Sequence, residues 1–343
     1  MKKTLVIAVL AGMTLSASAQ LDGLYYGGGS PVWPATSLNA NSYVDLANNY
    51  SAGAGSQFFG AKASGGVDVI ANYGSGWGTY PIVSGTYQAL TTAYATANQA
   101  FGAKAGGGVD AIYYSGGWTA TPVNPHSFVS LANVNAVNQF MGVRSAGSLE
   151  FTYYSSGWFN YTVGSGSYQK VINDPMNATS VYALRADGGI DRVTFNGSAW
   201  VTTTVDHTQT YVALTADSVV ANWVYGATAG GLYGIVDAGS GFGAPTLMNA
   251  NSYKELEDIT GAANQLFGAR ADGTGLDAVY FNGSVWVNYQ ANPNDYGVLL
   301  HDSNNGNLYA SVVPEPGTMS MLGLGGLILL YWRKKIQAGS SAK

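Results

Sequence analysis

At residues 59–68 the chain reads FGAKASGGVD, and 42 residues later, at residues 101–110, it reads FGAKAGGGVD. Weaker copies follow at residues 183–191, which read ALRADGGID, and at residues 267–277, which begin FGARADG and end in Leu276-Asp277. Each copy is followed by a tyrosine-rich or β-branched run, a turn of Gly, Ser or Asn, and a large aromatic residue. The middle of the chain is therefore built from one repeated unit.

The recurring aromatic residue gives the period of the repeat. Its members are spaced 40 to 44 residues apart and are Trp33, Trp77, Trp118, Trp158, Trp200, Phe242 and Trp286. Several short β-runs in a unit of this length predict the blade of a β-propeller. Helical repeats would need apolar residues at a 3.6-residue spacing and long stretches without glycine, and the units have neither. No Trp-Asp pair ends a strand and the period is short for a kelch unit, so the chain fits neither of those propeller families.

Within one unit we expect four strands, at residues 59–63, 67–73, 77–83 and 87–90. Tight turns join them, and glycine supplies the positive φ that such turns require. Large aromatic residues at a fixed blade position favour packing between blades, and stacking platforms for sugar rings are the alternative.

The two ends of the repeat region complement each other. Residues 21–26 (LDGLYY) parallel residues 276–281 (LDAVYF), so the first copy lacks its opening strand. Residues 308–312 (LYASV) supply such a strand, with Tyr309 lying 42 residues after Phe267. The sequence therefore predicts an all-β domain at residues 20–312, a seven-bladed β-propeller closed by its N- and C-terminal strands. Closure of this kind removes the exposed edges of an open sheet.

A basic residue and an acid recur at fixed positions in five units. The pairs are Lys62 with Asp68, Lys104 with Asp110, Arg144 with Glu150, Arg185 with Asp191, and Arg270 with Asp277. Across a hairpin with a three-residue loop we expect the two side chains directly opposite each other on one face. Two interpretations remain, a cross-strand salt bridge in each blade or a ring of charge offered to a ligand. The fifth internal unit has Thr228 and Tyr233 instead, and the loss of both partners together favours the structural role.

That fifth unit is also where we predict a ligand-binding cleft. Thr228, Tyr233 and Phe242 replace the residues common to the other units. A cleft that departs from the repeat is the part of such a fold most suited to a specific ligand.

Residues for other chemistry are sparse. The three histidines occupy non-equivalent positions, there is no cysteine, and no zinc motif, phosphate loop or serine-nucleophile elbow occurs. The sequence therefore predicts no catalytic set, no metal and no cofactor. Glu255, Glu257 and Asp258 adjoin Lys254, and we expect these charges to be solvated on an outer strand or loop.

The net charge of the repeat region limits the kinds of partner that it can bind. Residues 20–312 carry 8 Lys and Arg against 18 Asp and Glu, a formal charge of −10. An acidic domain without a basic cluster argues against nucleic acid and against anionic membrane surfaces.

The C-terminus carries a second kind of signal. Pro314-Glu315-Pro316 forms a stiff segment ahead of an apolar run at residues 319–332, and Arg333-Lys334-Lys335 follows. Residues 318–332 would make about 22 Å of helix at roughly 1.5 Å per residue, short of a hydrocarbon core of about 30 Å. We therefore expect a transient transmembrane helix stopped by the three basic residues, with a permanent tail anchor as the alternative.

This tail resembles the PEP-CTERM sorting signal of Gram-negative bacteria, which is also catalogued as an ice-binding-protein C-terminal domain. The resemblance covers residues 313–335, and the polar tail at residues 336–343 departs from it. It implies recognition by a membrane-embedded exosortase, transient contact with the inner membrane and cleavage near residues 314–316. Delivery to the outer surface or the extracellular polysaccharide matrix is then the expected outcome.

The N-terminus agrees with export. Lys2-Lys3, an apolar stretch at residues 4–15 and Ala17-Ser18-Ala19 have the three-part form of a secretory signal peptide. We expect the signal peptide to occupy residues 1–19.

Three functions fit these observations. The leading hypothesis is a non-enzymatic surface or matrix protein that binds polysaccharide or other cell-surface components. The others are an enzyme acting on extracellular polysaccharide, such as a lyase or glycosidase, and a passive envelope scaffold.

Overall fold

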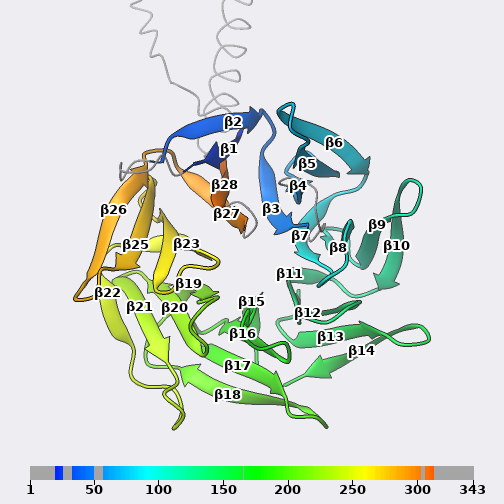
Figure 1. Cartoon of the computed structure of the whole chain (residues 1–343). Helices are drawn as coiled ribbons and strands as arrows, with labels where there is room; N and C mark the ends of the chain where they lie inside the picture. Colours follow the sequence, from blue (N-terminus) through cyan, green and yellow to red (C-terminus); the bar gives the residue numbers. More distant parts are fainter. Residues whose placement is uncertain (1–19, 26–32, 50–56, 165, 303–305, 313–343) are drawn as a thin grey trace, which may run out of the picture. The chain divides into compact units, whose positions relative to one another are not determined.

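The structure, a computed structural model, describes residues 20–25, 33–49, 57–164, 166–302 and 306–312. These residues form seven four-stranded antiparallel sheets, arranged around a central axis as the blades of a β-propeller (Figure 1). The predicted all-β, seven-bladed fold is confirmed. The predicted signal peptide at residues 1–19 and the segments at residues 313–335 and 336–343 lie outside the described residues. In the described part of the chain, no helix is long and apolar enough to cross a membrane.

Each blade contributes one strand to each of four concentric positions. The innermost strands are β3 (Tyr43–Asn48), β7 (Tyr87–Thr92), β11 (Phe128–Asn133), β15 (Tyr168–Asn173), β19 (Tyr211–Ala216), β23 (Tyr253–Asp258) and β27 (Tyr296–Asp302). The second strands are β4 (Gln57–Lys62), β8 (Gln99–Lys104), β12 (Gln139–Arg144), β16 (Ser180–Arg185), β20 (Trp223–Thr228), β24 (Gln265–Arg270) and β28 (Asn307–Val312). The third strands are β5 (Val67–Asn72), β9 (Val109–Tyr114), β13 (Leu149–Tyr154), β17 (Ile190–Phe195), β21 (Gly231–Val236), β25 (Leu276–Phe281) and β1 (Gln20–Leu24). The outer strands are β6 (Trp77–Val83), β10 (Trp118–Asn124), β14 (Trp158–Val163), β18 (Trp200–Asp206), β22 (Thr246–Asn249), β26 (Trp286–Asn292) and β2 (Ala35–Asn39).

The prediction for the fourth strand of a blade was wrong. The strand expected at residues 87–90 is β7, which pairs with β8 and opens the next blade rather than closing the blade of β4. The strand missing from the predicted blade is β3, at residues 43–48, which pairs with β4. A three-residue connection joins β6 to β7 and looks like a hairpin in sequence, but here it carries the chain from the rim of one blade to the centre of the next.

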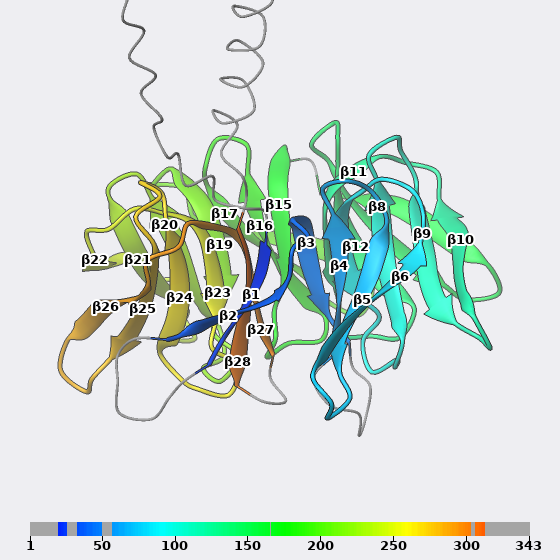
Figure 2. The ribbon, with the colours of Figure 1, turned by 90° about the horizontal axis from the view of Figure 1, so that it is seen from above.

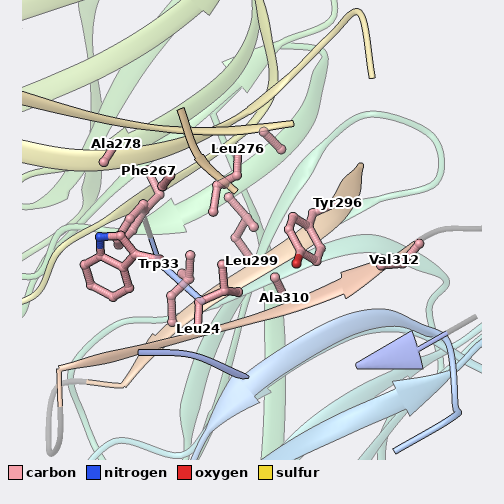
Figure 3. Packing of buried hydrophobic residues seen from close by; sticks show 12 residues of the cluster. Leu24, Trp33, Phe267, Leu276, Ala278, Tyr296, Leu299, Ala310 and Val312 are labelled. Carbon is pink, nitrogen blue, oxygen red and sulfur yellow. The ribbon is translucent and has the colours of Figure 1, made fainter. Parts of the chain in front are cut away.

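The seventh blade is made from both ends of the domain, as predicted. Its order is β2-β1-β28-β27, and β28 pairs with β1 in antiparallel register from Gln20↔Val312 to Leu24↔Leu308. These four strands also lie side by side in the view turned by 90° about the horizontal axis (Figure 2). Leu24 and Trp33 share one buried cluster with Phe267 of the preceding blade and with Val312 (Figure 3). Two segments from each terminus therefore complete a common core, which explains why the first copy in the sequence begins in the middle of a unit.

The glycine after the recurring Phe makes room for a ring from the innermost strand. A Cβ on Gly60 would lie 2.4 Å from Cδ1 of Tyr43, and one on Gly268 would lie 2.4 Å from Cδ1 of Tyr253. No side chain fits at that distance, so glycine lets the tyrosine ring cross the second strand. Gly102 and Gly226 lie against a tyrosine ring in the same way, and Gly142 lies against the ring of Phe128.

The recurring aromatic residue joins neighbouring blades. Each ring contacts an aromatic ring of the preceding blade, with centroids 4.9 to 6.4 Å apart, in the pairs Trp33–Phe267, Trp77–Tyr309, Trp118–Phe59, Trp158–Phe101, Trp200–Phe151, Phe242–Tyr182 and Trp286–Tyr225. Most of these pairs are edge-to-face, a geometry that aromatic quadrupoles favour. The expected packing between blades is confirmed.

Candidate functional site

The five predicted charge pairs all form, but not with the predicted geometry. The nitrogen–oxygen distances run from 2.7 Å for Lys62–Asp68 to 3.9 Å for Arg270–Asp277. The pairs were expected directly across the hairpin, whereas Asp68 lies opposite Gly60. Lys62 donates its backbone N–H to Gly66 within the turn, so its side chain reaches Asp68 diagonally.

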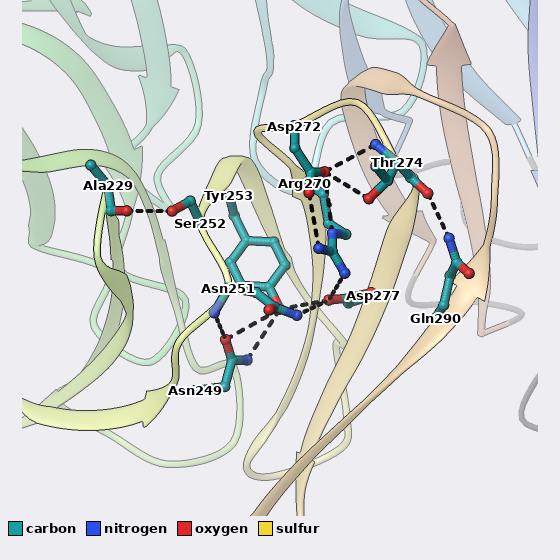
Figure 4. A network of polar contacts seen from close by, with 10 residues as sticks. All are labelled: Ala229, Asn249, Asn251, Ser252, Tyr253, Arg270, Asp272, Thr274, Asp277 and Gln290. Carbon is teal, nitrogen blue, oxygen red and sulfur yellow. Dashed lines mark hydrogen bonds and ion pairs between the residues drawn. The ribbon is translucent and has the colours of Figure 1, made fainter.

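The acid of each pair is buried, and in four of the five pairs it accepts a hydrogen bond from a tyrosine that the sequence did not reveal. Asp277 is 1% exposed and accepts hydrogen bonds from Tyr253 Oη at 2.8 Å and Asn251 Nδ2 at 2.8 Å, beside Arg270 (Figure 4). Equivalent tyrosine–aspartate bonds are Tyr43–Asp68, Tyr87–Asp110, Tyr168–Asp191 and Tyr296–Asp22. Burial, more than the neighbouring carboxylate, raises the pKa of Tyr253 well above its usual value, so its hydroxyl stays a donor.

Three blades depart from this pattern. The fifth internal blade has neither partner of the pair, and its Tyr211 donates to Asp206 at 2.7 Å instead. The other two blades compensate for the loss of one partner. The blade of β11 has Phe128 in place of tyrosine, and its longer acid, Glu150, accepts hydrogen bonds from Asn124 Nδ2 at 2.7 Å and contacts His126 Nδ1 at 2.9 Å. In the composite blade, Gln20 Nε2 donates to Asp22 at 2.9 Å where other blades place a basic side chain. The acid is satisfied in both cases, so the charge pairs serve the structure of each blade.

Replacing Tyr253 with Phe should therefore destabilise the propeller. Asp277 would lose one of its two short hydrogen bonds while remaining buried, at a cost of about 2 kcal/mol. Thermal unfolding of Tyr253→Phe measures this as a lower midpoint. Tyr280→Phe in the same blade is the matched control, because no carboxylate accepts from its hydroxyl among the described contacts. Equal midpoints for the two variants would contradict the structural role of the buried pair.

The structure gives each of the three residues predicted to bind a ligand in the fifth internal blade a local contact within the fold. Thr228 is 6% exposed, and its hydroxyl donates to the Gly231 carbonyl at 3.2 Å inside the β20–β21 turn. The Tyr233 ring packs edge-on to Tyr211, and Phe242 packs edge-on to Tyr182. Tyr233 and Phe242 cover the same buried cluster, while Thr228 lies at the end of its strand. The described structure does not gather the three around a pocket.

The acids expected to be solvated lie instead in the centre of the propeller. Glu255, Glu257 and Asp258 belong to β23, an innermost strand, and line a cavity of about 470 Å³ that all seven innermost strands surround. The prediction that they lie on an outer strand or loop was wrong, because it assumed that adjacent charges need bulk solvent. In β23 they face the central cavity together with Lys170 of β15, whose Nζ lies 2.5 Å from Glu255 Oε1.

Besides the central cavity, the outer side of the blade of β11–β14 also differs from the other blades. Tyr153 of β13 stacks on Phe159 of β14, with ring centroids 5.6 Å apart and an interplanar angle of 26°. Tyr161 packs on the buried Phe151 at 5.5 Å, and Trp200 of the next blade lies 5.0 Å from the same ring. We call Phe151, Tyr153, Phe159, Tyr161 and Trp200 the outer aromatic patch.

The outer aromatic patch is open to solvent and carries polar atoms at its rim. Phe159 is 46% exposed and Tyr161 is 41% exposed. Trp200 Nε1 donates to Tyr161 Oη at 2.8 Å, which fixes the two rings relative to each other. At the position of Phe159 the equivalent outer strands carry Gly78, Thr119, Val201 and Val287. The exposed ring is therefore not needed for the blade fold.

Sequence reasoning missed both surfaces, although each left a signal. Residues 151–161 contain six aromatic residues in eleven positions, a density found in no other unit. Three of the central charges, Asp45, Lys170 and Glu255, are the third residues of their innermost strands, where the other blades carry Ala89, Ser130, Ala213 and Val298. Placing those residues in one ring requires the correct strand assignment, which the sequence did not provide.

Comparison with known proteins identifies the C-terminal signal. Residues 312–335 match the model of the PEP-CTERM protein-sorting motif. The chain is thus a seven-bladed β-propeller protein with a PEP-CTERM sorting tail, and the tail implies an exported protein that is sorted through a membrane anchor in a Gram-negative bacterium. The predicted motif around Pro314, Glu315 and Pro316 is confirmed.

The propeller itself is similar to solved structures. One is a mutant lectin of Aleuria aurantia in complex with alpha-methyl-L-fucoside, with a TM-score of 0.49 and 12% identity over 74% of this chain and 97% of that one. No curated protein matches the sequence.

Proposed function

We propose that this protein is a non-enzymatic surface or matrix protein that binds polysaccharide through the outer aromatic patch. The observation that carries the proposal is the exposure of Phe159 and Tyr161 in a blade whose equivalents lack such a pair. Exposed apolar surface rimmed by polar groups marks binding sites. The apolar face of a sugar ring packs on an aromatic ring, and its hydroxyls exchange hydrogen bonds with phenol and indole groups such as those of Tyr161 and Trp200.

The composition of the patch favours a neutral or mildly polar polymer. None of its five members is charged, and two of them carry a hydroxyl group. The stacked rings are held by packing beneath them, which lowers the entropy lost on binding. An exported protein meets the extracellular polysaccharide matrix, so the partner and the patch share a location.

Affinity electrophoresis of the full chain through gels containing polysaccharide from the producing bacterium tests the proposal. Phe159→Ala and Tyr161→Ala should each weaken binding about three- to ten-fold, since an aromatic contact contributes about 0.5–1.5 kcal/mol. Val201→Ala is the matched control, because Val201 holds the position of Phe159 in the next blade and is 44% exposed.

Two outcomes would count against this function. If the gel does not retard the wild-type chain, the protein does not bind this polysaccharide. If Val201→Ala weakens binding as much as the patch variants do, the outer aromatic patch is not the binding site. Release of small products from the polymer would favour the alternative of a polysaccharide-active enzyme. Concentration-dependent association of the wild-type chain in sedimentation, without retardation by the polymer, would favour the passive scaffold.

A further inference from the structure

The central cavity holds more negative charge than the protein neutralises. Asp45 of β3, Glu255 and Glu257 of β23 and Asp258 at the end of that strand all line it, against a single cation, Lys170. Lys170 is already paired with Glu255. Its pKa is raised, because the pull of Glu255, Asp45 and Glu257 exceeds the opposing effect of burial.

No other cation of the propeller is free to compensate these acids. Every Lys and Arg in the described ranges between residues 20 and 312 makes an ion pair, the remaining seven being Lys62, Lys104, Arg144, Arg185, Arg192, Lys254 and Arg270. For the described propeller, neutralisation must therefore come from protons or from a cation outside residues 20–312.

The pKa values of three carboxyl groups that line the cavity are raised. Burial raises the pKa of Glu257 to about 8, although Glu257 accepts a hydrogen bond from the His301 backbone N–H at 2.9 Å; Asp258 and Glu255 raise it further and Lys170 opposes them. Burial likewise raises the pKa of Asp45 to about 7, although it accepts hydrogen bonds from the backbone N–H groups of Leu90 and Leu46 at 2.7 and 2.9 Å. His301 of β27 contributes no charge, because burial lowers its pKa to about 4.

One oxygen in the cavity wall has no partner at all. Asp258 is 7% exposed, its Oδ2 accepts from the Ser218 N–H at 3.2 Å, and its Oδ1 accepts no hydrogen bond. Burial raises the pKa of Asp258 to about 7. A buried carboxylate oxygen without a donor is unfavourable, so Asp258 favours a proton or an added positive charge close by.

We infer that the central cavity binds a small organic cation carrying primary ammonium groups. An ammonium group supplies three hydrogen-bond donors and a positive charge, which match the surplus of carboxylate acceptors. Among the described residues, no group of three or more ligands is arranged for a metal ion, which favours an organic cation. A volume of about 470 Å³ accommodates a small molecule, since such sites span roughly 300–1,000 Å³. This inference is independent of the outer aromatic patch.

Titration calorimetry of the full chain with putrescine, a short diammonium compound, tests the inference. Putrescine should bind, whereas butanediol, which has the same length and no charge, should not. Binding should strengthen from about pH 6 to about pH 8.5, because Asp45, Glu257 and Asp258 ionise over this range while putrescine stays charged. Glu255 and Lys170 are the other charged groups that face Glu257.

Two substitutions should act in opposite directions. Glu257→Gln should weaken binding by about ten-fold or more through loss of a charged hydrogen-bond acceptor. Lys170→Gln should strengthen it several-fold, because it removes the competing cation. Gln169→Ala, a neutral change in the cavity lining, is the control and should leave the affinity unchanged. If the cluster had only a structural role, the two substitutions would not change the affinity for putrescine in opposite directions.

The overturning results are equally specific. Lack of putrescine binding to the wild-type chain at both pH values would overturn the inference, as would equal binding of butanediol. Binding of butyrate that Lys170→Gln abolishes would assign the cavity to anions instead. If Lys170→Gln fails to fold, Glu257→Gln and the comparison with butanediol still decide.

Discussion

Ending the chain at residue 306 should abolish cooperative unfolding of the propeller, whereas ending it at residue 312 should preserve it. Both variants lack the C-terminal sorting tail, so they differ only by β28 at Asn307–Val312. That strand pairs with β27 on one side and with β1 on the other. Its removal therefore separates the two ends of the domain, rather than trimming an edge.

The energetic cost is comparable to the stability of the whole domain. Leu308, Tyr309 and Val312 are at most 4% exposed. Burial of three such side chains contributes roughly 5–8 kcal/mol, against a total of about 5–15 kcal/mol for a typical protein. Trp77 would also lose the Tyr309 ring that it contacts from the next blade, at 5.2 Å between centroids.

Circular dichroism with thermal melting measures the outcome. The chain ending at residue 312 should give one sharp transition, and the chain ending at residue 306 should give a broad or absent one. If the two chains melt at the same temperature, closure through β28 does not stabilise the propeller. Leu308→Ala in the longer chain should fall between them, about 2–5 kcal/mol less stable than its parent.

Replacing Pro314, Glu315 and Pro316 with alanine should leave the propeller folded and retain nearly all of the protein in the inner membrane. The matching motif spans residues 312–335. The substitution removes its Pro-Glu-Pro triplet and keeps the apolar run and Arg333-Lys334-Lys335. Proline fixes φ and holds the segment extended, a form that a helix-prone alanine triplet loses. We expect the processing enzyme to fail on the altered segment.

Fractionation of cells that produce each variant provides the measurement. Wild-type protein should appear at the surface or in the medium, and the triple variant should remain in the inner-membrane fraction at higher mass. A control with alanine at Gln337, Gly339 and Ser340 changes the polar tail beyond the basic cluster and should behave like the wild type. Unchanged release of the triple variant would contradict sorting through this motif.

The repeat, the number of blades and the closure of the ring could be predicted from the sequence alone. These follow from local events, because a glycine turn between two short β-runs forms a hairpin wherever it occurs, and the period counts the hairpins. The sequence also determined the sorting motif, since that signal is a linear string. The pairing of Lys62 with Asp68 was predictable for the same local reason, although the diagonal geometry was not.

Two features could not be predicted without the three-dimensional arrangement: which strand opens a blade, and which residues share the centre. The three residues between β6 and β7 resemble a hairpin, yet the strands lie in different sheets. Lys170 and Glu255 are 85 residues apart in sequence and meet only because the closed ring brings β15 and β23 to one cavity. The outer aromatic patch likewise needs Trp200 from the neighbouring blade. The recurring aromatic residue predicted that neighbouring blades pack together, but which other side chains meet across blades depends on how the closed ring positions each strand.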